Sequence, residues 1–230
     1  MKQAKTLVHK ITNHTRIFDE TLRIYNEALT YVIDVIDCEF DDLSIHNKQS
    51  ITKAVEQLIH RTVKNPVVKY VSFDEQFYKF PSYLRRAAII DAFGKVKSFR
   101  TLYKKWLEQK EHVEACGKRF SKKPPTKQYV HKQFPVLYKN NMFVRTSETT
   151  ARIKAFVKND WIWIDVNIKK QSAEKRRVVD WTQCNPMLVR KGKKYFLHIT
   201  YEKNIQLNQT HWTKQNVCAV DLGLTNSAVC

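Results

Sequence analysis

The chain has 230 residues, a hydrophobic fraction of 43% and a formal net charge of +19, with a pI near 9.7. This length and apolar content suffice for one large domain or two small ones. The sequence has neither a run of about 18 apolar residues nor a signal-peptide pattern, so we expect a cytoplasmic protein that does not enter a membrane. A positive excess of this size indicates a polyanionic partner.

The positive charge is concentrated in one part of the chain. Residues 1–80 contain 11 Lys and Arg against 11 Asp and Glu, whereas residues 95–154 contain 16 Lys and Arg against four Glu. Binding to a membrane surface is the rival use of such charge. However, Pro and aromatic residues interrupt the basic region, which does not form one amphipathic helix. We therefore favour nucleic acid as the partner.

Apolar residues at helical spacing predict three helices in the first half of the chain. The first covers residues 13–37, the second covers 48–63, and the third and most regular covers 83–109. A basic loop follows at 117–127, where two consecutive prolines exclude a helix. The first half should therefore be helical.

After this loop the apolar pattern alternates, which predicts strands rich in β-branched and aromatic residues. The last two segments before residue 202 flank a Gly and predict a hairpin. The pattern as a whole indicates an α+β protein. The predicted strands are residues 143–145, 153–157, 161–166, 187–190, 195–201 and 217–220.

The end of the chain carries the strongest functional signal. An apolar run ends in Asp221, and Leu222, Gly223 and a polar turn follow. A carboxylate at the end of a buried strand is a rigid mount for a metal ion, and two-metal nucleases use such ions to stabilise both oxygens of phosphoryl transfer. Gly223 allows a tight turn and leaves room for a phosphate. The alternative is that Asp221 caps an ordinary turn.

Three stretches together resemble the TnpB (OrfB) family of transposon-encoded proteins, which are relatives of compact type V CRISPR effectors. They are FPSYLRRAAIIDAFGKVKSF at 80–99, MLVRKGKKYFLHITYEK at 187–203 and VCAVDLGLTNSAV at 217–229. The resemblance implies a helical recognition insert within a small antiparallel β-barrel, the wedge domain, followed by the first strand pair of an RNase H-like (RuvC) domain. The implied boundaries are a first wedge strand at 1–12, the helical insert at 13–115, a basic loop at 116–125, the wedge β-barrel at 126–212 and the start of RuvC at 217–230.

The resemblance also implies an activity, which is RNA-guided and Mg²⁺-dependent cleavage of DNA with guide RNA and target DNA as partners. Of three expected catalytic carboxylates, only Asp221 matches a position of this sequence, and it is the one expected Mg²⁺ ligand. The other carboxylates and the family's zinc-binding cysteine pairs would lie C-terminal to it. The five cysteines here form no CxxC pair, so we expect no zinc site. We expect an incomplete catalytic site and no cleavage by this chain alone.

Basic residues on and after the third predicted helix are the candidate nucleic-acid contacts. They could follow a phosphate backbone, releasing a counterion for each phosphate neutralised. The alternative is a solvated helix face and, after it, a flexible linker. Four aromatic residues directly before Arg85 could stack on bases but are more typical of a core; they are Phe77, Tyr78, Phe80 and Tyr83. The candidate contacts are Arg85, Arg86, Lys97, Arg100, Lys104, Lys105, Lys118, Arg119, Lys122 and Lys123.

Two other functions are consistent with the same residues. The chain could be a nucleic-acid-binding protein that does not cleave, such as a shortened regulator of an intact relative. It could also be the helix-turn-helix DNA-binding module of a conventional transposase, although the sequence shows no helix pair with the short turn of that motif.

Overall fold

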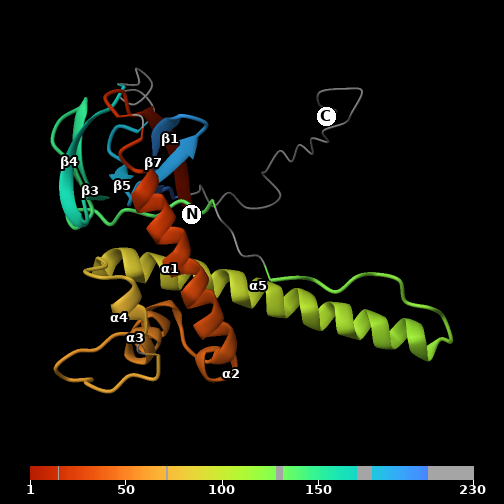
Figure 1. Ribbon diagram of the computed structural model, residues 1–230. Coiled ribbons are helices and arrows are strands. Elements are labelled where there is room, and N and C mark those ends of the chain that lie inside the picture. The colour runs from red at the N-terminus through yellow and green to blue at the C-terminus, as the bar shows by residue number, and fades with distance from the viewer. Residues whose placement is uncertain (15, 71, 128–131, 170–177, 207–230) are drawn as a thin grey trace, which may run out of the picture.

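A computed structural model describes residues 1–14, 16–70, 72–127, 132–169 and 178–206 of the chain. The fold is α+β, and the strands gather at one end of the molecule while most of the helices lie at the other (Figure 1). The elements in chain order are β1 (Lys2–Lys10), α1 (Asp19–Cys38), α2 (Phe40–Leu43), α3 (Lys48–Ile59), α4 (Ser72–Gln76), α5 (Ser82–Ala115), β2 (Phe143–Arg145), β3 (Thr150–Val157), β4 (Asp160–Asn167), β5 (Thr182–Gln183), β6 (Met187–Lys191) and β7 (Lys194–Asn204).

The hydrophobic periodicity predicted the long elements correctly. The three expected helices are α1, α3 and α5, and α5 continues six residues beyond the expected end at 109. The expected hairpin is β6 and β7, and Gly192 in its turn has a φ of +58°, a conformation that glycine adopts without strain. The predicted strand at 217–220 lies outside the described residues.

The two ends of the described chain meet in one sheet. β1 pairs with β7 in antiparallel register from Lys2 opposite Asn204 to Lys10 opposite Phe196. The other edge of β7 pairs with β6 and then β5, which completes a four-stranded sheet. A second sheet has the order β2-β3-β4. All the helices of the described residues therefore lie between β1 and its partner strands in the sequence, so they form an insertion in a β unit.

The expectation of a closed β-barrel is not met by the described strands. They form two antiparallel sheets, and neither closes on itself. A single bridge between Ile11 and Ile168 joins the residue after β1 to the residue after β4 and so links the sheets, and a second bridge joins Val136, in the segment before β2, to Met187 in β6. The assignment of 1–12 and 126–212 to a wedge domain, and of 13–115 to a recognition insert, stays a prediction.

Helices and sheets share one hydrophobic core. Phe18 just before α1, Tyr25 and Leu29 from α1, Ile89 from α5 and Leu197 from β7 belong to the same buried cluster. A polar bond joins the layers as well, because the amide of Phe156 in β3 donates to the buried Thr21 hydroxyl of α1 at 2.8 Å. The helical insertion is thus held firmly against the sheets. In the described residues, no helix is both long and apolar enough to cross a membrane.

Candidate nucleic-acid interface

Helix α5 has two halves with different surroundings. In the first half, Leu84, Ala88, Ile89 and Ala92 are buried against the core. The last buried residue is Val96, and beyond it the helix projects away from the body (Figure 1). With 34 residues, α5 is about 50 Å long at the usual rise of 1.5 Å per residue. The amphipathic pattern of the sequence continues through both halves, but only the first half has a core to cover.

We call residues 97–127 the arm. It consists of the projecting half of α5 and an extended segment that returns alongside it toward the body (Figure 1). The indole Nε1 of Trp106 donates to the carbonyl of Lys122 at 2.9 Å, and the rings of Trp106 and Phe120 meet edge to face at 5.7 Å between centroids. These contacts hold the returning segment on the helix. The arm contains ten Lys and Arg against three Glu.

Seven of the ten predicted contact residues form the open basic surface of the arm. Lys97 and Lys104 are two helical turns apart on one face, and Lys105 lies about 100° further round. The other four lie on the returning segment. In the described structure all seven are exposed and none has an acidic partner. They are Lys97, Lys104, Lys105, Lys118, Arg119, Lys122 and Lys123.

Arg100 is also on the arm, but an acid from another helix already binds it. Its Nε donates to Oδ1 of Asp37 at 2.7 Å and its Nη2 to the Asp37 carbonyl at 2.8 Å. Lys127, at the end of the returning segment, binds Oδ2 of the same carboxylate. We call Asp37, Arg100 and Lys127 the arm clamp. Burial acts to raise the pKa of Asp37, but hydrogen bonds from Lys127 and Arg100 outweigh it and lower the pKa.

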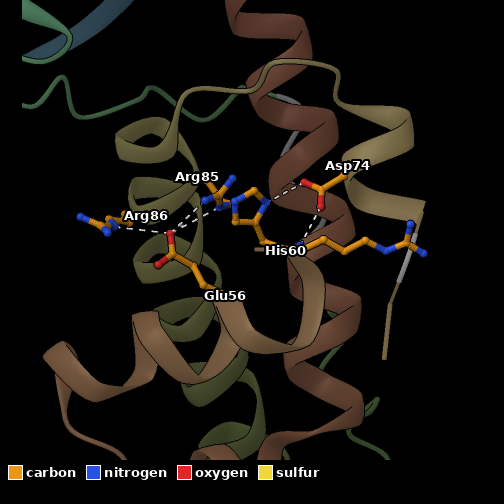
Figure 2. Close-up of polar contacts among 6 residues, drawn as sticks. Glu56, His60, Asp74, Arg85 and Arg86 are labelled. Atoms are coloured by element: carbon orange, nitrogen blue, oxygen red, sulfur yellow. Dashed lines mark hydrogen bonds and ion pairs between the residues drawn. The ribbon is translucent and has the colours of Figure 1, made fainter. Parts of the chain in front are cut away.

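Arg85, one of the predicted nucleic-acid contacts, does not belong to the open basic surface, and its contact with nucleic acid stays a prediction. Its side chain lies in the first, buried half of α5, and the residue is 5% exposed. Its Nε and Nη2 both donate to Oε1 of Glu56 in α3 at 3.3 Å (Figure 2). Burial lowers the pKa of Arg85, and Glu56 opposes that shift. The sequence pattern did not reveal this ion pair, because its acidic partner lies 29 positions away in the sequence.

Arg86, the next residue, shares Glu56 but faces the solvent. Its Nε lies 3.4 Å from Oε1 of Glu56, and 42% of its side chain is exposed. Its guanidinium lies 5.3 Å from the ring centre of Tyr83. Arg86 is therefore a half-exposed cation near the start of α5, and Glu56 already neutralises part of its charge.

A second polar group in Figure 2 joins α3 to α4. The Nδ1 atom of His60 lies 2.8 Å from Oδ1 of Asp74, and the backbone amide of Arg61 donates to Oδ2 of the same carboxylate at 3.0 Å. Asp74 therefore holds the chain just after the end of α3. The group is a structural joint like the Glu56 pair beside it. The core interpretation holds for Phe77 and Phe80 nearby, which are buried, whereas Tyr83 is partly buried and Tyr78 is 68% exposed.

Sequence reasoning missed one basic surface. Lys191, Lys193 and Lys194 surround Gly192 in the β6–β7 turn, and all three are exposed. Arg190 before them pairs with Asp19 at the start of α1, with 2.9 Å between Nη1 and Oδ1. The run KGKK was visible in the sequence. The Gly in this run predicts a turn, but a hairpin pattern does not show whether the lysines of the turn are exposed or paired with acids.

The predicted catalytic and metal residue Asp221 lies outside the described residues. Among the residues that are described, no three His, Cys, Asp or Glu side chains gather in a way that could hold a metal ion. The expectation that Asp221 binds Mg²⁺ therefore stays a prediction.

A family model described as the Aq_aa04 family matches residues 5–157, which is more than half of the chain. The matched region begins within β1, contains α1 to α5 and the whole arm, and ends with the last residue of β3. A search of curated proteins found no match.

Proposed function

We propose that this chain, which belongs to the Aq_aa04 family, binds nucleic acid through its basic arm. The observation that carries the proposal is the exposure of seven Lys and Arg side chains on a projecting arm, without acidic partners in the described structure. Cations that stabilise a fold lie beside acids, as Arg85 and Arg100 do. Cations gathered on an arm without acids raise the local potential and attract a polyanion.

The resemblance of 80–99, 187–203 and 217–229 supports a finer proposal. In it, the nucleic acids are a guide RNA and a target DNA, the helical insertion is the recognition insert, and the sheets belong to a wedge domain. The activity would be that of a TnpB-like RNA-guided nuclease, with Asp221 as one Mg²⁺ ligand. Mg²⁺ held there would stabilise the charge that develops on the phosphate during cleavage.

Binding by the arm can be tested with charge removal on matched surfaces. In the arm variant, Lys97, Lys104 and Lys105 are changed to Gln. In the control variant, the same change is made at the exposed residues Lys53, Lys64 and Lys203, which lie off the arm. Fluorescence anisotropy with a labelled RNA, titrated at several salt concentrations, measures both the affinity and its salt dependence.

We expect the arm variant to bind less tightly and to show a shallower dependence of log K on log salt. Three lost phosphate contacts to a single strand correspond to a slope change of about 2. The control variant should keep the native slope. Equal losses in both variants would show that the chain attracts RNA only through its net charge, and would overturn the assignment to the arm.

The nuclease proposal needs a separate assay. DNA cleavage is measured with guide RNA and Mg²⁺ for the native chain and for Asp221→Ala. For this chain alone we expect RNA binding without cleavage. Cleavage that Asp221→Ala abolishes would contradict that expectation and would show a functional metal site.

A further inference from the structure

A hollow of about 390 Å³ lies at the base of the arm, between α5 and the segment that returns from the arm to the body. It lies beside the basic surface, but the side chains that line it are of different kinds. Its walls combine a carboxylate, a cation, hydroxyl groups and apolar side chains. The lining residues are Ile90, Asp91, Gly94, Lys95, Ser98, Phe99, Leu102, Pro125, Thr126 and Gln133.

Gly94 in this wall has no role in the packing of the described protein. It lies in the middle of α5, and a Cβ atom added to it would meet nothing within 4 Å. A glycine inside a helix destabilises it relative to Ala, because its backbone loses more freedom on folding. The packing of the protein does not require a glycine at this position. A ligand that approaches the helix backbone would require one, because a side chain would occupy the same space.

Two charged side chains of the hollow, Asp91 and Lys95, could each bind a different part of a nucleotide. Asp91 accepts a hydrogen bond from the hydroxyl of Tyr25 at 2.6 Å through Oδ2, which holds the carboxylate in place. In the described structure its Oδ1 has no hydrogen-bond partner. Lys95 can pair with a phosphate, and a carboxylate oxygen can accept from a hydroxyl but not from a phosphodiester.

The apolar walls complete the arrangement. Phe99 is partly exposed and Leu102 is 56% exposed, because both line the hollow and are not packed in the core. An exposed ring next to a cation offers a face on which an unpaired base can stack. A duplex does not present such a base, because its bases already stack on one another.

We propose that this hollow binds one ribonucleotide of an unpaired RNA strand, with its sugar against Gly94 and its 2′-hydroxyl donating to Asp91. Lys95 then binds a neighbouring phosphate, and Phe99 and Leu102 contact the base. The inference rests on the proposed binding of nucleic acid by the arm and names the substrate class. Because a 2′-hydroxyl distinguishes RNA from DNA, the hollow gives the arm a preference that charge alone cannot give.

The test uses Gly94→Ala and the larger Gly94→Leu, with Thr101→Ala as the control. Thr101 is on the same helix but does not line the hollow, so its replacement also strengthens the helix without narrowing the site. Affinities are measured for an unstructured single-stranded RNA and for DNA of the same sequence, and thermal unfolding shows that each variant is folded.

The native chain should bind the RNA about tenfold more tightly than the DNA, which corresponds to one hydrogen bond. Gly94→Ala should raise the melting temperature yet reduce the RNA affinity toward that of DNA, and Gly94→Leu should reduce it further. Thr101→Ala should keep the native preference.

Equal binding of RNA and DNA by the native chain would overturn the inference, as would folded Gly94 variants that keep the full RNA affinity. If the arm variant loses affinity in those cases, the proposed function stands and only the hollow is refuted. If the native chain binds neither strand, both proposals fail.

Discussion

Replacing Arg85 should destabilise the fold far more than replacing its neighbour Arg86. The two side chains share the Glu56 carboxylate at 3.3 and 3.4 Å, but one is almost fully buried and the other is half exposed. Arg85→Met and Arg86→Met keep most of the side-chain volume and remove the charge. Because the same substitution is made beside the same carboxylate, the difference between the two variants measures the effect of burial.

The magnitude follows from the surroundings of Glu56. Removing one partner of a buried ion pair typically costs about 3–5 kcal/mol, because the remaining charge is left without a partner. Glu56 keeps Arg86, and 18% of its side chain is exposed, so we expect about 2–3 kcal/mol for Arg85→Met. An exposed pair contributes about 0.2–1 kcal/mol, which is the loss expected for Arg86→Met.

Urea denaturation followed by circular dichroism measures both values. Glu56→Gln added to Arg85→Met should recover part of the loss, because it removes a largely buried charge that has lost one of its two partners. RNA affinity at a temperature where Arg85→Met is folded should equal that of the native chain. Equal destabilisation by the two substitutions, or a folded Arg85→Met that binds RNA less tightly, would refute the assignment of Arg85 to the core.

Two further predictions concern single side chains. Burial, with Lys191 nearby, lowers the pKa of His198 in β7, so the folded state binds its proton less readily than the unfolded state. Its contribution to the free energy of unfolding is therefore complete above the unfolded pKa of about 6.5 and is lost as the pH falls through the folded pKa. His198→Gln should flatten that part of a pH series of urea titrations, and an unchanged slope would contradict the argument. Asp37→Ala should release the arm clamp, so limited trypsin digestion should cut the arm several times faster while the rest of the chain stays resistant; cleavage at the native rate would show that the clamp does not hold the arm.

The prediction of helices and strands from the sequence succeeded because periodicity is a local property. Apolar spacing located α1, α3 and α5, and alternation located β3, β4 and the β6–β7 hairpin. The concentration of basic residues after residue 95 was equally visible, because charge is counted without a fold.

The partners of these elements and charges were not visible, because each depends on residues distant in the sequence. Arg85 and Arg86 are neighbours in the chain, yet a rotation of about 100° along the helix buries one and exposes the other. Arg100 meets Asp37 across 63 positions, which removes one cation from the open surface. The sequence determined that the chain is basic, α+β and helical in its first half. Only the tertiary structure decided which cations remain open to a partner, and that Gly94 borders a hollow, because burial and ion pairing arise when separate segments pack together.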